Sequence, residues 1–148
     1  MMKTILDKTT RDELINRVAT LNEQSTPLWG KMNIYQMVKH CTLWDEMALG
    51  KKEYKQSFLG RLFGKMALRN MLKDDKPLGR NVPTVPAFVI KENGDFLSEK
   101  AKWISLLNGY DQLSNSGFIH PFFGKMTKEQ IGYIVYKHID HHLRQFNS

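Results

Sequence analysis

The chain has 148 residues, a net charge of +7 and a single cysteine. Three Trp, eight Phe and eight Met indicate a packed globular protein and exclude a disordered one. One cysteine excludes an internal disulfide framework, and no stretch is apolar for long enough to span a membrane. We therefore expect a single domain over residues 1–148, in the cytoplasm and without a signal peptide.

The positive charge raises nucleic acid as a partner. The lysines and arginines are, however, spread along the chain, and they lack a recognition-helix pattern or interleaved aromatic residues. We expect a solvated basic surface, with nucleic acid not a favoured partner.

Capping signals and apolar periodicity predict two helices in the first third of the chain. The first begins with a capping box at Thr10 and runs to about Gln24. The second begins at Asn33, which has N-cap spacing to Gln36, and it stops at Gly50.

Residues 51–76 read as a linker followed by a third, basic amphipathic helix. A membrane-surface helix has this composition, but Gly60 and Gly64 weaken an isolated helix. We therefore favour a crossover helix that covers the other helices. Prolines and glycines then mark a long irregular connection, with a short extended piece at residues 85–90, and its length indicates a crossover between parallel helices.

The remaining chain predicts two more helices with a loop between them. One begins at Asp95 and loosens near Gly109, and a loop over residues 115–125 contains His120. The last helix follows Thr127, which has capping-box spacing to Gln130. The predicted class is all-α.

The last helix carries the most informative motif. Ile131, Val135, His138 and His142 fall within roughly 60° of one another on a helical wheel, so two imidazoles share the inward face. His141 lies at the edge of this face. Buried imidazoles need partners, and a metal ion binds neutral nitrogens one turn apart, as in the HExxH zinc helix. The alternative is a pair of hydrogen-bonded core histidines.

A third histidine is placed to join them. His40 lies on the flank of the buried stripe of the second helix, and three neutral imidazoles would leave a divalent ion an open position for a substrate. The neighbouring Cys41 is interpreted as a small core residue. Asp45, Glu46 and His120 are candidates for acid–base help, although we favour His120 as a cap at a helix end.

Four segments carry a resemblance to a known family. They are Trp29-Gly30-Lys31-Met32-Asn33, Met37-Val38-Lys39-His40, His120-Pro121-Phe122-Phe123-Gly124-Lys125-Met126-Thr127 and His138-Ile139-Asp140-His141-His142-Leu143-Arg144-Gln145-Phe146. Together they resemble the DinB/YfiT-like metalloenzyme superfamily, and within it a subfamily of unknown function with a His-Pro-x-x-Gly loop and a His-His-Leu-Arg-Gln ending.

The resemblance implies a four-helix bundle with a long crossover connection that carries an extra short helix, often as a homodimer. It also implies a divalent metal, zinc or nickel, held by His40, His138 and His142. Members of the superfamily include hydrolases and thiol-dependent S-transferases that use a low-molecular-weight thiol.

Three hypotheses follow for the function. The leading one is a metal-dependent hydrolase or thiol S-transferase that acts on a small molecule. The second is a non-catalytic helical bundle that binds a small ligand or a protein partner. The third is a basic protein that binds nucleic acid or a membrane surface.

Overall fold

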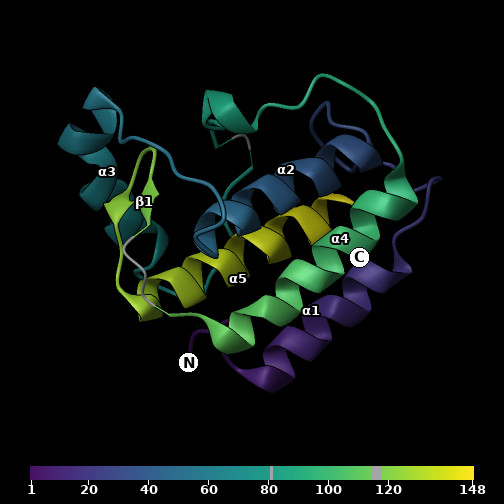
Figure 1. Cartoon of the computed structure of the whole chain (residues 1–148), viewed down its shortest axis with the longest axis horizontal. Helices are drawn as coiled ribbons and strands as arrows, with labels where there is room; N and C mark the ends of the chain where they lie inside the picture. Colours follow the sequence, from purple (N-terminus) through teal and green to yellow (C-terminus); the bar gives the residue numbers. More distant parts are fainter. Residues whose placement is uncertain (81, 115–117) are drawn as a thin grey trace.

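The computed structural model describes residues 1–80, 82–114 and 118–148, and Figure 1 shows their arrangement. The described elements are α1 (Lys8–Thr20), α2 (Ile34–Ala48), α3 (Phe58–Met71), the 3-10 turn η1 (Pro86–Phe88), α4 (Phe96–Gly109), the 3-10 turn η2 (Tyr110–Gln112), β1 (Ile119–His120), β2 (Gly124–Lys125) and α5 (Lys128–Gln145). The predicted all-α class is confirmed, because the sheet is a hairpin of two-residue strands.

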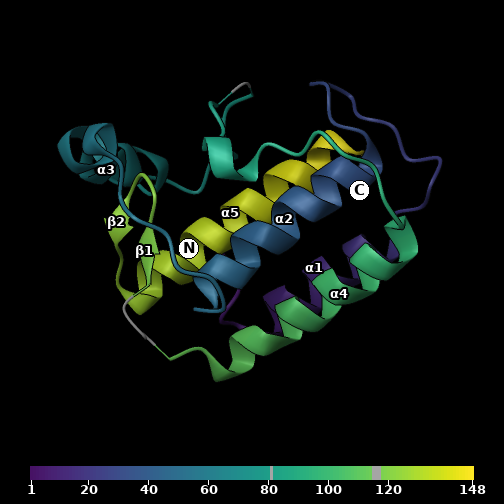
Figure 2. The same ribbon diagram turned by 45° about the horizontal axis from the view of Figure 1, so that its top comes forward.

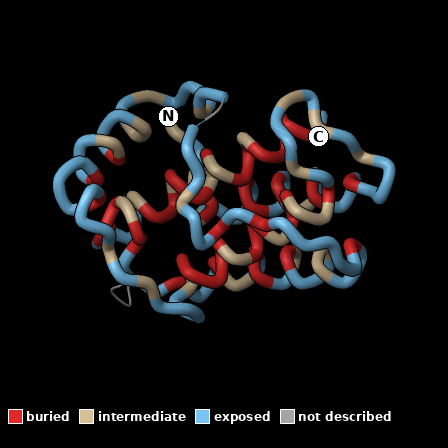
Figure 3. Tube along the Cα trace, turned by 90° about the horizontal axis from the view of Figure 1, so that it is seen from above, coloured by how far each residue is buried: buried red, intermediate tan, exposed pale blue. Residues whose placement is uncertain are grey.

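Four helices surround the hydrophobic core. Helix α2 packs against α4 and α5, and α1 packs against the same two helices; Figure 2 shows these neighbours from a second side. The buried residues lie where the helices face one another, as Figure 3 shows. Among the described residues, no helix is both long and apolar enough to cross a membrane. That these four helices form a bundle of the DinB-like type stays a prediction.

The predicted capping boxes of α2 and α5 are confirmed. In α2 the Asn33 side chain accepts from the backbone N–H of Gln36, and the Gln36 side chain accepts from that of Asn33. Thr127 and Gln130 make the same reciprocal pair at the start of α5. Asp95 caps α4 as predicted, accepting from the backbone N–H of Ser98.

The predicted bounds of α1 are wrong at both ends. Its N-cap is Asp7, whose carboxylate accepts from the backbone N–H of Thr10, so the helix begins before the predicted capping box. It ends at Thr20 and does not reach Gln24. There the Lys100 ammonium, delivered by α4, donates to two backbone carbonyls at the end of α1. This tertiary contact satisfies carbonyls that a longer helix would have used.

The irregular regions hold two small elements that the sequence did not predict. The piece expected to be extended at residues 85–90 instead contains η1, which Pro86 opens. In the expected loop, residues 118–125 contain the antiparallel hairpin of β1 and β2, with Gly124 at a φ of 73°. The predicted irregular connection at residue 81 and the predicted loop at residues 115–117 lie outside the described residues.

Helix α3 does not cover the other helices as predicted. It packs mainly on β2, at one end of the molecule (Figures 1 and 2). Its buried residues are Gly60, Gly64 and Leu68. A Cβ atom at Gly60 would lie 2.5 Å from the backbone oxygen of Phe122, and one at Gly64 would clash with the same oxygen. The glycines therefore let the hairpin backbone approach the helix closely.

Candidate metal centre

Two packed helices bring three histidines together. His40 lies in the second turn of α2, and His138 and His142 lie one turn apart on α5. In a search of the described residues, these three form a group whose ligand atoms all lie within 4.8 Å of one another. The side chains converge as the helical periodicity predicted.

The proton of the His40 ring is fixed by a backbone carbonyl. Nδ1 of His40 lies 2.9 Å from the oxygen of Phe88 in η1, and a carbonyl can only accept, so Nδ1 carries the proton. Nε2 of a neutral His40 is then left with a lone pair. It faces Nε2 of His138 at 2.9 Å.

His142 is held in the same way by a side-chain amide. Nδ1 of His142 lies 2.8 Å from Oε1 of Gln145, while Nε2 of Gln145 donates to the carbonyl of Trp29 at 2.9 Å. This second bond assigns the amide oxygen to His142, so Nδ1 of His142 is the donor. Its Nε2 therefore also carries a lone pair. Such outer partners orient the imidazoles that bind metals and raise their basicity.

His138 lacks an equivalent partner. Its Nδ1 is buried and has no hydrogen-bond partner among the residues that the structure describes. The indole of Trp44 stacks on its ring, with centroids 5.0 Å apart and planes 24° apart. As a whole residue His138 is half-buried, whereas His40 and His142 are buried.

Burial keeps all three imidazoles neutral. It is the main cause that lowers the pKa of His40 and of His138, and it lowers the pKa of His142 to about 3. The neighbouring rings add to this effect, because a charge on one disfavours a charge on the next: His142 and His40 lower the pKa of His138, and His40 lowers that of His142. Neutral imidazole is the form that binds a metal.

These residues fit a divalent cation. Bonds of about 2.0–2.1 Å to a tetrahedral zinc would place two ligand nitrogens about 3.3 Å apart. The 2.9 Å separation of the His40 and His138 nitrogens and the 4.8 Å limit for the group bracket this value. Without a cation, Nε2 of His138 would donate to Nε2 of His40, whereas a bound cation would receive the lone pairs of both atoms. Nδ1 of His138 has no hydrogen-bond partner among the described residues in either case.

The neighbours of the cluster lie largely where the sequence placed them. His141 is half-buried at the edge, with its ring 5.6 Å from that of Trp29. The Arg80 guanidinium lies 4.1 Å from the centroid of the same Trp29 ring. Cys41 is fully buried in the core and is not part of the metal-ligand group.

The three candidates for acid–base help are engaged elsewhere. Asp45 accepts from the Trp103 indole at 2.8 Å and the Tyr110 hydroxyl at 2.6 Å, on the side of α2 that faces α4. Glu46 forms ion pairs with two lysines, Lys52 and Lys102. These contacts give both carboxylates a structural role.

The preference for His120 as a helix cap is wrong. Its Nδ1 accepts from the backbone N–H groups of Phe122 and Phe123, both at 3.0 Å, so it closes the turn of the hairpin. Its ring contacts Trp44 at 5.4 Å, and the same indole stacks on His138. His120 thus packs against the indole that stacks on His138, and it contacts the cluster through Trp44. Burial lowers its pKa to about 3, which keeps it neutral.

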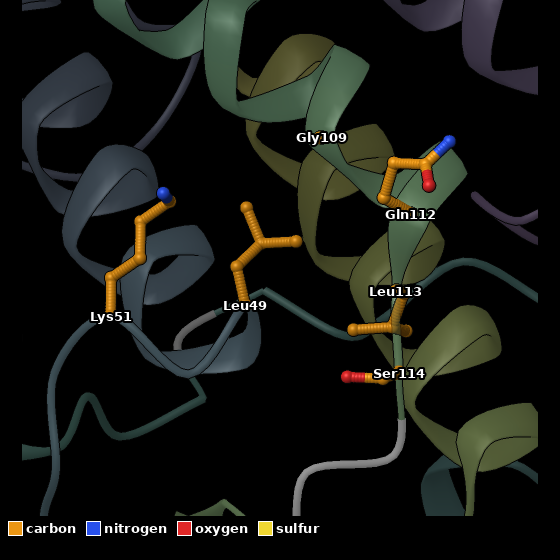
Figure 4. A pocket seen from close by; sticks show the side chains of 6 residues that line it. All are labelled: Leu49, Lys51, Gly109, Gln112, Leu113 and Ser114. Atoms are coloured by element: carbon orange, nitrogen blue, oxygen red, sulfur yellow. The ribbon is translucent and has the colours of Figure 1, made fainter.

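A separate hollow lies away from this cluster, where α2 ends beside α4 and η2 (Figure 4). Its lining consists of Leu49, Lys51, Gly109, Gln112, Leu113 and Ser114. No clustered histidine belongs to this lining, so we do not assign chemistry to it.

The sequence did not predict the two groups that orient the histidines. Gln145 lies three residues after His142, and this i, i+3 spacing on one helix face was a usable signal. The carbonyl of Phe88 had no such signal, because η1 was expected to be extended and lies far from His40 in the chain.

Comparison with known proteins adds a family but no activity. No curated protein and no solved structure matches the chain. A protein-family model described as "Protein of unknown function (DUF1569)" matches residues 1–148. Since this match spans the whole sequence, the chain belongs to the DUF1569 family.

Proposed function

We propose that this protein is a metal-dependent enzyme with a DinB-like four-helix bundle. His40, His138 and His142 would hold one divalent ion, zinc or nickel, by neutral nitrogens. The observation that carries the proposal is the pair of hydrogen bonds behind the ligands. The Phe88 carbonyl holds the Nδ1 proton of His40, and the Gln145 side-chain oxygen holds that of His142. Both rings therefore keep a lone pair on Nε2. Core histidines that serve packing alone have no need of this shared orientation.

The proposed reaction class, taken from the superfamily that the sequence resembles, is hydrolysis or thiol S-transfer on a small molecule. A divalent ion in this site would supply a Lewis acid that lowers the pKa of a water or of a low-molecular-weight thiol. The chain's own residues would hold the ring orientations, keep the imidazoles neutral and exclude water on the buried side.

The metal content of protein purified without an affinity tag tests this proposal. We expect close to one zinc or nickel ion per chain by elemental analysis, and we expect its loss in His40→Ala, His138→Ala and His142→Ala. His141→Ala is the matched control, because His141 is on the same helix but outside the ligand group. Unchanged metal content in the three cluster variants would remove the site.

Activity is the second measurement. Metal-depleted protein is screened against ester and amide substrates, and against electrophiles with a low-molecular-weight thiol, before and after the ion is restored. Turnover that returns with the ion supports an enzyme. Purified protein that lacks stoichiometric metal, and whose melting temperature a chelator leaves unchanged, would favour a non-catalytic bundle whose histidines are merely hydrogen-bonded.

A further inference from the structure

Helix α3 exposes the residues that an amphipathic helix normally buries. Its buried side consists of two glycines and one leucine. Its large apolar residues face solvent with exposed fractions of 48–74%, and they are Phe58, Leu59, Leu62, Phe63 and Met66. We call these five residues the α3 apolar face.

The orientation of α3 is fixed at both ends and along its buried side. Ser57 caps the N-terminus through its hydroxyl and donates its backbone N–H to the carbonyl of Pro121 at 2.8 Å. At the other end the buried Lys137 ammonium of α5 donates to the carbonyl of Met71 at 2.7 Å. Because the glycines admit the hairpin backbone, rotating the helix to bury its apolar face would break all of these contacts. The exposed apolar face is therefore part of the folded state.

The charged residues of α3 are all cationic. Residues 58–71 contain no Asp or Glu, and Arg61, Lys65 and Arg69 lie on the exposed side. Just beyond the helix, Lys73 continues the same four-residue spacing; Asp74 and Asp75 follow it, and the Asp74 carboxylate lies 4.0 Å from the Lys137 ammonium. A partner of this surface must therefore offer both an apolar layer and negative charge.

A second copy of the chain does not meet this requirement. Pairing α3 with itself would place arginines and lysines against one another. Five side chains of this size and exposure offer on the order of 500 Å², whereas a stable protein interface buries about 800 Å² on each partner. This area is about that of the largest apolar patch on a typical monomer, roughly 300–600 Å², and such a patch is often functional.

We propose that α3 binds the surface of an anionic lipid bilayer. Phe, Leu and Met side chains would enter the boundary between headgroups and acyl chains, while the arginines and lysines would contact anionic headgroups. The position of α3 at one end of the long axis, apart from α1 and α4, leaves it free to lie on a flat surface (Figure 1). This inference is independent of the metal centre.

Flotation of the full-length protein with lipid vesicles tests the proposal. We expect it to bind vesicles of phosphatidylcholine and phosphatidylglycerol at low salt and to leave vesicles of phosphatidylcholine alone unbound. Added salt should weaken the binding, because it screens the headgroup charge. Failure of the wild-type protein to bind anionic vesicles would overturn the proposal, including the case in which α3 instead binds an acidic protein.

Matched variants assign the binding to α3. An apolar variant replaces three side chains of the α3 apolar face: Phe58→Ser, Leu62→Gln and Met66→Gln. A charge variant carries Arg61→Gln, Arg69→Gln and Lys73→Gln. Each should lower vesicle binding by at least about tenfold. The controls are Leu97→Gln, which removes a leucine of similar exposure from α4, and the combined Lys51→Gln, Lys55→Gln and Lys128→Gln.

Two outcomes would contradict the assignment even if vesicles are bound. One is that the α3 variants bind as well as the wild type, or no worse than their controls. The other is a wild-type dimer in sedimentation that the apolar variant converts to a monomer, which would make the α3 apolar face a contact between copies. Circular dichroism verifies that each variant is folded, which is expected because the replaced side chains face solvent.

Discussion

Asp45→Asn should stabilise the protein at neutral and alkaline pH. The Asp45 carboxyl is fully buried, and burial raises its pKa from 3.8 to about 7 despite hydrogen bonds from Tyr110 and Trp103. The folded state therefore holds a proton that the unfolded state releases. Stability from this group is present below about pH 4 and is lost as the pH rises toward 7 and above. At roughly 1.4 kcal/mol per pKa unit, the rise corresponds to about 4 kcal/mol.

Asparagine reproduces the protonated carboxyl. Its oxygen can accept from the Trp103 indole, and its amide nitrogen can donate to the Tyr110 oxygen once that hydroxyl, which donates to Asp45 in the wild type, turns its proton away. The variant should match the wild type near pH 4 and exceed it by up to about 4 kcal/mol near pH 8.

Urea unfolding of both proteins at each pH measures this difference. The buried histidines shift stability in the opposite direction, because acid must charge them: the His142 contribution is lost as the pH falls from 6.5 toward about 3. Taking the difference between variant and wild type cancels that effect. A difference that is constant with pH, or that favours the wild type above pH 7, would refute the buried neutral carboxyl.

Three further predictions concern the other contacts. Gln145→Leu should weaken metal affinity about 10–100-fold in a competition titration, since it removes the acceptor that orients His142; unchanged affinity would remove that role. Gly64→Ala should destabilise the protein by about 1–3 kcal/mol, because the added Cβ would overpack against the hairpin backbone. Gly79→Ala is the control: its Cβ would meet open space, so the stability of this variant should stay within about 0.5 kcal/mol of the wild type. Equal melting temperatures for the two variants would contradict the close contact at Gly64. Lys137→Met should lower the free energy of unfolding by about 1–3 kcal/mol, because it leaves three backbone carbonyls without their shared donor. Amide hydrogen exchange should become faster in residues 71–76 only. Unaltered exchange there would show that the Lys137 ammonium does not hold this segment.

Local patterns predicted the parts of the fold that depend on neighbouring residues. The caps at Asn33 and Thr127 and the shared face of His138 and His142 each depend on a spacing of three or four residues. The end of α1 could not be predicted in this way, because the Lys100 ammonium that satisfies its last carbonyls comes from a distant helix.

The orientation of α3 could not be predicted from the sequence for a related reason. Apolar periodicity assigns Leu62 and Met66 to the buried side of a helix, since burial of apolar area usually decides which side faces inward. Here Gly60 and Gly64 decide instead, because their missing side chains admit the backbone of the hairpin. The sequence contained both signals, but only the tertiary contact shows which one prevails.

Two of the buried polar residues of α2, His40 and Asp45, face opposite neighbours. His40 and Asp45 are five residues apart, about 140° around the helix. His40 faces the histidines of α5, whereas Asp45 accepts from Trp103 on α4 and from Tyr110 just beyond it. A change at Asp45 should therefore alter pH-dependent stability and leave metal affinity intact, and a change at Gln145 should do the reverse. If Asp45→Asn also weakened metal binding, the two faces would be coupled through α2, and the outer support of His40 and His142 would not suffice to fix the site.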